Sequence, residues 1–278
     1  MRRRLLAFTA ILAMLSLVSA PTASAVQEIQ KAEPYIGQPG KDVIWVPTPM
    51  NLVEAMLDMA RVTRSDTLVD LGSGDGRIPI TAAKRGLRAL GIEYNPDMVA
   101  IAREKAKKEG VADRATFWEG DIFVTDFSQA TVVTMYLLSD LNLKLRPTIL
   151  DMKPGTRVVS HSFSMGDWEE DARADVEGGT AYLWIVLAKV EGVWTWNEGL
   201  DEAVLTLRQD YQKIEGSLKI GERERQLSNA FLEGDRIRFE VNDAAGNSQF
   251  SGRVSGKTMK GTATGRNGKS SAWSATSR

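Results

Sequence analysis

The segment Val69-Asp-Leu-Gly-Ser-Gly-Asp-Gly-Arg77 constrains the fold of this chain more than any other part of its sequence. The apolar run from Thr67 to Leu71 predicts a buried strand, and a helix is expected directly after the last glycine. Gly72, Gly74 and Gly76 allow a sharp turn between the two and let a ligand approach the main chain closely. The free N–H groups at the start of the helix would point toward such a ligand. The segment therefore predicts a strand–turn–helix unit that binds a nucleotide-like molecule.

The spacing of these glycines separates two classes of ligand. The dinucleotide fingerprint G-x-G-x-x-G, counted from Gly72, needs its third glycine at the position that Arg77 occupies. Asp70 ends the strand close to where a pyrophosphate would lie, and its carboxylate would repel phosphate. The same carboxylate suits a ligand that carries an ammonium and a sulfonium, as S-adenosylmethionine does. Here the chain resembles the seven-strand, Rossmann-like (class I) S-adenosylmethionine-dependent methyltransferases.

Two further acids lie where that resemblance needs them. A second expected strand, from Ala89 to Glu93, ends in a carboxylate about 20 residues past the glycine turn, where it can accept both ribose hydroxyls. A third expected strand, from Ala115 to Trp118, leads to Asp121, which by resemblance accepts from the adenine amino group. The other residues expected at the cofactor are Ser73, Tyr94, Ile122 and Thr48.

Helical and strand patterns alternate through the first two thirds of the chain, as a doubly wound, mostly parallel α/β sheet requires. Helices are expected at 50–61, 77–86, 96–109 and 141–152, and strands at 67–71, 89–93, 115–118, 131–138 and 156–163. Tyr182 to Lys189 and Val193 to Asn197 are expected to form a hairpin that supplies the antiparallel edge of this sheet. The methyltransferase domain is accordingly placed at 26–198.

Residues 199–278 lose the helical period and predict a small all-β domain, either an antiparallel sheet or an open barrel. Strands are expected at 203–208, 212–220, 235–241, 249–254, 258–263 and 271–275. Past Asp243 this part holds no acid, whereas it holds six cations: Arg253, Lys257, Lys260, Arg266, Lys269 and Arg278. A solvated surface is the favoured interpretation of these cations, with a binding patch as the alternative.

Residues 1–25 are interpreted as a secretory signal peptide. Arg2 to Arg4 is a basic region, Leu5 to Val18 is apolar, and Ala23-Ser-Ala25 matches a cleavage site. The favoured location is therefore periplasmic, with an uncleaved membrane anchor as the alternative. Either location leaves open how the enzyme meets S-adenosylmethionine, which is made in the cytosol.

Composition excludes several kinds of chemistry. The chain has no cysteine, which rules out disulfides, thiolate zinc sites and a cysteine nucleophile. Its net charge of -1 implies no general affinity for nucleic acid or anionic membrane. No metal is expected either, because metal-assisted catechol methylation needs clustered acids and Asp140 stands alone.

The methyl acceptor is expected near Tyr136, Asn142, His161 and the stretch Val46-Pro-Thr-Pro49. His161 could take a proton or be bonded into the structure, Tyr136 could act in chemistry or pack against the ligand, and Asn142 could cap the following helix. The turn Tyr136-Leu-Leu-Ser139 lacks the N/D-P-P-Y/F pattern of enzymes that methylate exocyclic or amide nitrogens. DNA adenine and glutamine amides are therefore poor candidates.

Several segments resemble a narrower group, the protein-lysine methyltransferases of the adenine nucleotide translocase and ATP synthase c-subunit type. They are Pro34-Tyr35, Val46-Pro-Thr-Pro49, Val133-Thr-Met-Tyr-Leu-Leu138, Asn142-Leu-Lys-Leu-Arg-Pro147, Ser160-His161 and Met165-Gly-Asp-Trp168. The resemblance covers about residues 34 to 190 and implies a protein lysine as acceptor. The acidic loop from Asp167 to Glu177 could attract such a cation or simply be a solvated surface. A small-molecule acceptor, and an exported binding protein on a degenerate methyltransferase scaffold, remain the alternatives, and the oligomeric state stays open.

Overall fold

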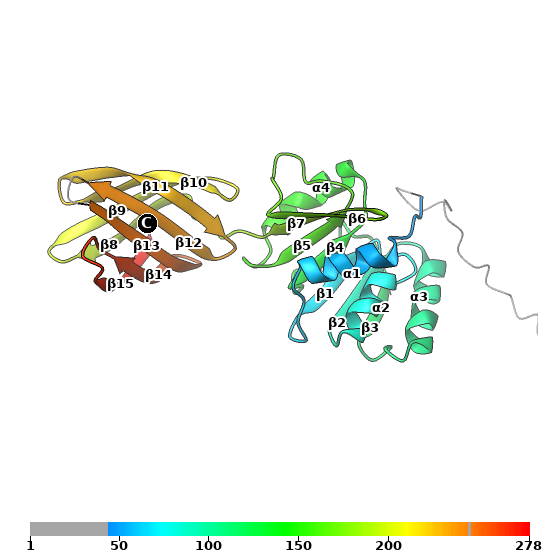
Figure 1. The fold of residues 1–278 in the computed structure, drawn as a ribbon. Helices are drawn as coiled ribbons and strands as arrows, with labels where there is room; N and C mark the ends of the chain where they lie inside the picture. Colours follow the sequence, from blue (N-terminus) through cyan, green and yellow to red (C-terminus); the bar gives the residue numbers. More distant parts are fainter. Residues whose placement is uncertain (1–43, 244–245) are drawn as a thin grey trace, which may run out of the picture. The chain divides into compact units, whose positions relative to one another are not determined.

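The computed structural model describes residues 44–243 and 246–278. They form an α/β part and a β-barrel, which Figure 1 shows in blue to green and in yellow to red. The expected signal peptide at 1–25 and the pair Pro34-Tyr35 lie outside the described residues. None of the helices in the described ranges is long and apolar enough to cross a membrane.

The α/β part is built on a seven-stranded sheet of order β3-β2-β1-β4-β5-β7-β6. Its parallel strands are β1 (Thr67–Leu71), β2 (Arg88–Glu93), β3 (Ala115–Glu119), β4 (Val132–Met135) and β5 (Arg157–His161). Strands β6 (Ala172–Val176) and β7 (Gly179–Ile185) run antiparallel at the other edge. The helices are α1 (Met50–Met59), α2 (Arg77–Lys84), α3 (Pro96–Lys108) and α4 (Ser139–Leu150). The expected Rossmann-like fold is thus confirmed.

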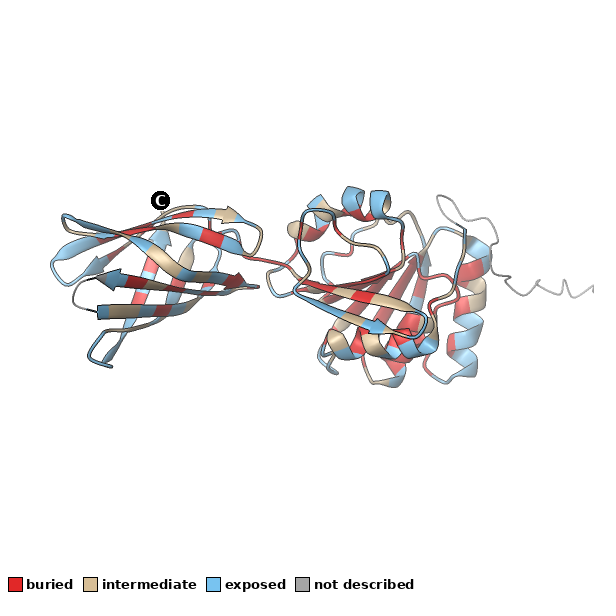
Figure 2. Cartoon of the chain, turned by 45° about the horizontal axis from the view of Figure 1, so that its top comes forward, coloured by how far each residue is buried: buried red, intermediate tan, exposed pale blue. Residues whose placement is uncertain are grey.

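Strand β1 lies at the centre of this sheet and is buried on both faces. Leu68 packs in one apolar cluster with residues of α1 and α2, whereas Val69 and Leu71 pack in a second cluster with residues of α4. A parallel strand covered by helices on both sides reads as a continuous apolar run, which is why the sequence identified it. Figure 2 shows the burial concentrated along the sheet strands and the helix faces turned toward them.

The order of the strands reverses beside β1, which pairs with β2 on one side and with β4 on the other. Connections leaving β1 and β4 therefore diverge to opposite faces, and a crevice opens at the carboxyl ends of the two strands. In this register Asp70 is opposite Thr134. The fold thereby brings the glycine turn and the residues after β4 to one edge of the sheet.

The prediction of a hairpin at 182–197 is wrong. Strand β7 pairs instead with β5 and with β6, and β6 lies within the segment interpreted as an acidic loop. The segment Ala172–Val176 carries exposed charged residues at alternate positions, so its sequence did not indicate an edge strand. The other half of the expected hairpin, β8 (Gly192–Glu198), pairs with β9 and β15, and so belongs to the barrel rather than to the region 26–198. Trp194 and Trp196 decide this, because they are buried in the barrel core.

The C-terminal part is a closed barrel and not an open one, with strand order β10-β11-β12-β13-β14-β15-β8-β9. Its further strands are β9 (Asp201–Asp210), β10 (Lys213–Ile220), β11 (Arg223–Glu233), β12 (Arg236–Asp243), β13 (Gly246–Ser255), β14 (Thr258–Thr264) and β15 (Ser270–Ser277). Strand β11 was not expected from the sequence, since Leu232 is its one fully buried residue and the rest has the polar pattern of a loop. Closure leaves no unpaired sheet edge.

Candidate functional site

The glycine turn has the conformation that its sequence predicts. Gly72, Gly74 and Gly76 have φ of +76°, +52° and +79°, a region that residues with a Cβ adopt rarely. The N–H groups of Gly72 and Ser73 donate to the carbonyl of Ile92 at 2.9 and 3.0 Å, so the turn is fastened to the end of β2.

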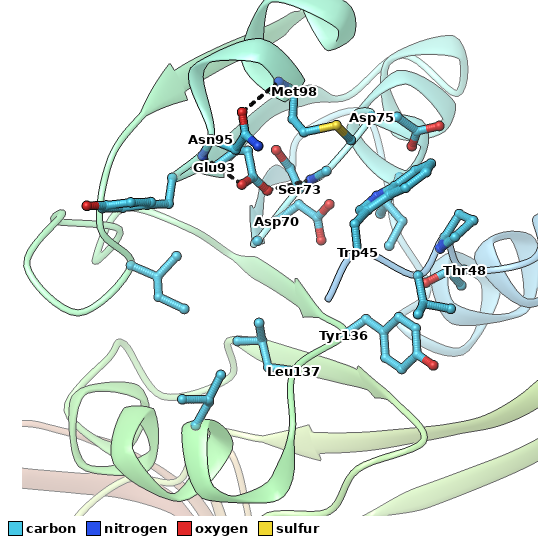
Figure 3. A pocket seen from close by; sticks show the side chains of 18 of the residues that line it. Trp45, Thr48, Asp70, Ser73, Asp75, Glu93, Asn95, Met98, Tyr136 and Leu137 are labelled. Atoms are coloured by element: carbon cyan, nitrogen blue, oxygen red, sulfur yellow. Dashed lines mark hydrogen bonds between the residues drawn. The ribbon is translucent and has the colours of Figure 1, made fainter. Parts of the chain in front are cut away.

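A cavity of about 470 Å³ opens at the end of β1, above this turn (Figure 3). Of the residues expected at the cofactor, all but Gly76 line it: Thr48, Asp70, Gly72, Ser73, Gly74, Glu93, Tyr94, Asp121 and Ile122. Tyr136 also lines it, whereas Asn142 and His161 do not. One connected site therefore forms from residues far apart in the sequence.

Gly76 has a different role from the one expected. It is the residue before α2 and has a left-handed conformation. A Cβ at this position would lie 2.6 Å from the ring of Phe117 and 2.8 Å from the Cβ of Ala102. Gly76 is thus needed for close packing of the start of α2 against α3 and β3, and it does not line the cavity.

Asp70 is the residue that best indicates the charge of the ligand. Its side chain is buried, faces the cavity and accepts a hydrogen bond from the Thr134 hydroxyl at 2.7 Å. Burial raises the pKa of Asp70 to about 7, the nearby carboxylates of Glu93 and Asp75 add to the rise, and the Thr134 bond opposes it. A cationic group in the cavity would stabilise the charged carboxylate. The ammonium of S-adenosylmethionine fits this requirement.

Glu93 and Asp121 are held in place by backbone N–H groups. Glu93 accepts from Gly74 at 2.9 Å through one oxygen and from Asn95 at 2.9 Å through the other. Asp121 accepts from the N–H of Phe123 at 2.9 Å. A carboxylate oxygen can accept more than one hydrogen bond, so both side chains can still receive hydroxyl or amino groups of a nucleoside. They would hold the ribose and the adenine, with Tyr94 and Ile122 as apolar neighbours.

Residues 44–48 form a wall of the cavity, of which the sequence indicated the part from Val46 onward but not Ile44 and Trp45. A Cβ on Gly74 would lie 2.4 Å from Nε1 of Trp45, so the indole rests directly on the glycine turn (Figure 3). Arg77 donates to the carbonyl of Thr48 at 2.8 Å and forms a two-point ion pair with Asp75 at 2.8 and 2.9 Å. Arg77 thereby ties this wall to the turn.

Asp75 is a second buried carboxylate that the sequence analysis overlooked. Burial alone would raise its pKa, but hydrogen bonds from Arg77 and Lys105 hold the pKa of Asp75 below its ordinary value. Because these two cations already neutralise Asp75, Asp70 is the one of these two buried carboxylates that remains to meet a cationic ligand. The Asp-Gly-Arg sequence after Gly74 was the available signal for this ion pair.

Of the two roles expected for His161, its surroundings favour the structural one over that of proton acceptor. The ring is buried, stacks on Tyr136 with 3.7 Å between centroids, and has Nδ1 3.1 Å from the hydroxyl of Thr48. Burial lowers the pKa of His161 to about 4, against a raising hydrogen bond to the backbone of Gly178. His161 is therefore neutral near pH 7 and positions Tyr136 and Thr48, which both line the cavity.

Asn142 lies inside α4 and does not cap it, because the helix begins at Ser139. Its side chain is fully buried, and its amide donates to the carbonyls of Phe163 at 3.1 Å and Ser164 at 3.3 Å. Asn142 thus shapes the loop after β5, and Phe163 of that loop lines the cavity. Its effect on the site is indirect.

The acidic segment 167–177 contributes no residue to the cavity lining. Three of its acids are paired: Asp167 with Arg146, Glu169 with Lys213 at 2.9 Å, and Asp175 with Arg173 at 2.9 Å. The expectation that it could draw a cationic acceptor into the site is therefore not supported, and the solvated surface is the better interpretation.

The crevice at the strand reversal, the glycine turn and the carboxylates at the ends of β1, β2 and β3 define a class I S-adenosylmethionine-dependent methyltransferase. Residues 70–172 match the family described as the ANTKMT methyltransferase domain. A protein-lysine N-methyltransferase of Saccharolobus islandicus is 44% identical over 52% of this chain and 94% of its own length. The chain belongs to this family of methyltransferases.

Two other comparisons add detail. The lysine N-methyltransferase of the ATP synthase c-subunit from Homo sapiens is 36% identical over 46% of this chain and 54% of its own length. A solved structure described as an RNA methyltransferase from Salinibacter ruber, in complex with S-adenosyl-L-homocysteine, is 51% identical. That match has a TM-score of 0.51 and covers 52% of this chain and 96% of the other. The cofactor of this enzyme is S-adenosylmethionine.

Replacing Arg77 by methionine should weaken cofactor binding without unfolding the protein. The change removes the bond to the Thr48 carbonyl and leaves Asp75 paired with Lys105 alone, which costs roughly 1–3 kcal/mol. We expect the dissociation constant for S-adenosylmethionine, measured by isothermal titration, to rise by about tenfold or more. Arg85→Met is the matched control, because Arg85 lies at the other end of α2 and pairs with Glu54 and Asp58 away from the cavity. Equal affinities of the two variants would contradict the role of Arg77.

Proposed function

We propose that this enzyme transfers the methyl group of S-adenosylmethionine to the ε-amine of a lysine in a protein. The observation that carries the proposal is the division of the cavity. Its acids lie at the glycine turn and at the ends of β1 to β3, whereas the lining contributed by the chain after β4 and β5 is apolar and aromatic: Tyr136, Leu137, Leu138, Leu141 and Phe163. The names of the two relatives cited above, both lysine methyltransferases, support the same acceptor.

This division suits the chemistry of a lysine amine. S-adenosylmethionine supplies an electrophilic methyl group on a sulfonium, and the attacking amine must be uncharged. An apolar environment disfavours the ammonium form and lowers its pKa, so lysine can lose its proton to water before it attacks. A carboxylate beside the acceptor would do the opposite. The remaining task is alignment of the amine with the methyl group, which packing of Tyr136 and Phe163 can provide.

Tyr136 and Thr48 are the polar side chains on the acceptor side of the lining, and His161 fixes both. Their hydroxyls are available as hydrogen-bond acceptors for an amine. His161, outside the lining, takes no direct part in the proposed reaction.

RNA is the second candidate acceptor, because the similar Salinibacter ruber protein is described as an RNA methyltransferase. The charge of the cavity lining argues against RNA as the acceptor. The one cationic side chain that lines the cavity in the described residues is Arg77, which is paired with Asp75. A nucleic-acid substrate would meet acids and apolar surface rather than a phosphate-binding rim.

Transfer of labelled methyl groups separates these acceptors. Extracts of the host that lack the gene are incubated with the full chain and S-adenosylmethionine carrying an isotope-labelled methyl group. We expect label in protein that resists ribonuclease, and mass spectrometry should place it on lysine. Glu93→Ala, which removes a cofactor ligand, is the inactive control. Label released by ribonuclease would establish RNA instead, and label in small molecules would establish the remaining alternative.

The location expected from residues 1–25 is part of the same proposal. The enzyme would act outside the cytoplasm or at the membrane, where the labelled protein should then be found. A fusion of the segment Met1 to Gln30 to a reporter active only outside the cytoplasm tests this, and an inactive fusion that is also absent from the membrane fraction would contradict it.

A further inference from the structure

Four cations gather on the outer face of the barrel: Arg236, Arg238, Arg253 and Lys260, here called the cationic face. Arg236 is opposite Arg253 in the register of β12 and β13, and Arg253 is opposite Lys260 in that of β13 and β14. Arg238 follows two residues after Arg236 and so points to the same side of β12. None of the four is buried, whereas Ile237 between the two arginines of β12 is buried in the core. Pairing of the three consecutive strands β12, β13 and β14 thus aligns these charges.

The cationic face is hollowed. An open hollow of about 730 Å³ lies on it, and its lining includes the four cations, the acid Glu233 and the small residues Ser251 and Thr262. Phe231 stands at its side, 36% exposed, with the guanidinium of Arg238 4.7 Å from its ring centroid. The hollow therefore offers guanidinium, ammonium and hydroxyl donors around one aromatic ring.

Acids neutralise the cationic face only in part. Asp235 pairs with Arg253 at 2.7 Å, and Glu233 is opposite Arg236 in the strand register. Within residues 44–243 and 246–278, Arg236 and Lys260 have no ion-pair partner. Residues 246–278 contain no acid at all. The net charge of -1 for the whole chain conceals this separation of charge.

We propose that the cationic face binds the phosphate headgroups of an anionic phospholipid surface. Guanidinium groups form two-point hydrogen bonds with phosphate oxygens, and the exposed residues Ser251 and Thr262 add hydroxyl donors to the lining of the hollow. A compact hollow with a single aromatic ring suits a headgroup. Single-stranded nucleic acid is bound along an extended groove with several stacking aromatics. This surface lies outside the cofactor cavity, and its role does not depend on the identity of the methyl acceptor.

Sedimentation with lipid vesicles tests the proposal on the full chain. Vesicles of phosphatidylglycerol mixed with phosphatidylcholine are compared with vesicles of phosphatidylcholine alone, at low and high salt. We expect preferential binding to the anionic vesicles that weakens with salt, and a loss of about fivefold in that preference for each cation removed from the face. The double variant Arg236→Ser/Lys260→Ser should therefore lose about twenty-five-fold.

The matched control is Arg208→Ser/Lys219→Ser. It removes the same charges from exposed positions of β9 and β10, and β9 is across the closed strand order from β13. Residues 1–25 are the same in both variants and so contribute equally to binding. Retained preference in the control and loss in the Arg236/Lys260 variant supports the proposal. Equal loss in both variants, or no preference for anionic vesicles, overturns it. Tighter binding of single-stranded RNA than of vesicles, lost in the Arg236/Lys260 variant, also overturns it, in favour of a nucleic-acid partner.

Discussion

Replacing Asp70 by asparagine is expected to weaken binding of S-adenosylmethionine at pH 7 by roughly thirtyfold or more, because it removes a charged partner worth about 2 kcal/mol. Asparagine keeps the shape of the side chain and can still accept from Thr134, so the fold should survive. Isothermal titration gives the dissociation constants. Asp140→Asn, an exposed acid in the first turn of α4 that does not line the cavity, is the matched control.

The same residue predicts how affinity depends on pH. Burial raises the pKa of Asp70 from 3.8 to about 7 in the unliganded protein, and the ammonium of the cofactor favours the ionised form. Affinity should therefore fall as pH drops below about 7, by no more in total than the loss expected for Asp70→Asn, and level off above pH 7. The Asp70→Asn variant should lose this dependence. A wild-type affinity that is constant from pH 5 to pH 7 would contradict the role of Asp70.

The stability of the cofactor-free protein should change with pH in the sense opposite to that of the cofactor affinity. Between pH 3.8 and about 7 the folded protein keeps a proton on Asp70 that the unfolded chain releases. The contribution of the neutral carboxyl to stability is therefore fully present below the unfolded pKa of 3.8 and is lost as pH rises through about 7. The difference in free energy of unfolding between wild type and Asp70→Asn, followed across this range in urea, isolates this contribution from that of other groups.

The substitution Gly76→Ala is expected to destabilise the α/β part by about 2–5 kcal/mol. Denaturant unfolding measures this loss. One cause is the left-handed backbone, with φ of +79°. The other is overpacking, since the new methyl group would lie 2.6 Å from Phe117 and 2.8 Å from Ala102. Loss of cofactor binding should follow from the displaced turn.

Gly110→Ala separates these two causes. Gly110 also has a left-handed backbone, with φ of +68°, but a Cβ there would meet nothing within 4 Å. It should lose only about 1–2 kcal/mol. Combining Gly76→Ala with Phe117→Leu should recover part of the stability lost in the single variant, because the ring atoms that clash are removed. If Gly76→Ala and Gly110→Ala were equally destabilising, the packing argument would be wrong.

Local patterns predicted the cofactor half of the site well. The strands that end in Asp70 and Glu93 are buried and apolar, and positive φ at alternating glycines is a local backbone property. Each could therefore be identified without knowing its neighbours in space. The edges of the structure were harder to predict: β6 and β11 expose most of their side chains, so their sequences lack the apolar alternation of a half-buried strand.

The acceptor half depends on contacts between distant segments, and there the sequence left alternatives. His161 and Thr48 are 113 positions apart, and nothing local to either indicates that they are hydrogen-bonded. The place of Trp45 on the glycine turn, and the neutralisation of Asp75 by Lys105 from α3, are likewise results of packing. A residue at a strand tip can face the cavity or the core, and only the packed neighbours decide which.

By itself, the sequence determined the class of ligand, because the spacing of three glycines and the acids at successive strand ends fix backbone shape and charge locally. The tertiary structure alone decided that Gly76 serves packing, that His161 positions its neighbours, and that Trp45 and Arg77 complete the cavity. It also decided that β8 joins a closed barrel by pairing with β15. The physical reason is the same in each case: burial and pairing depend on partners that the chain supplies from far away in its sequence.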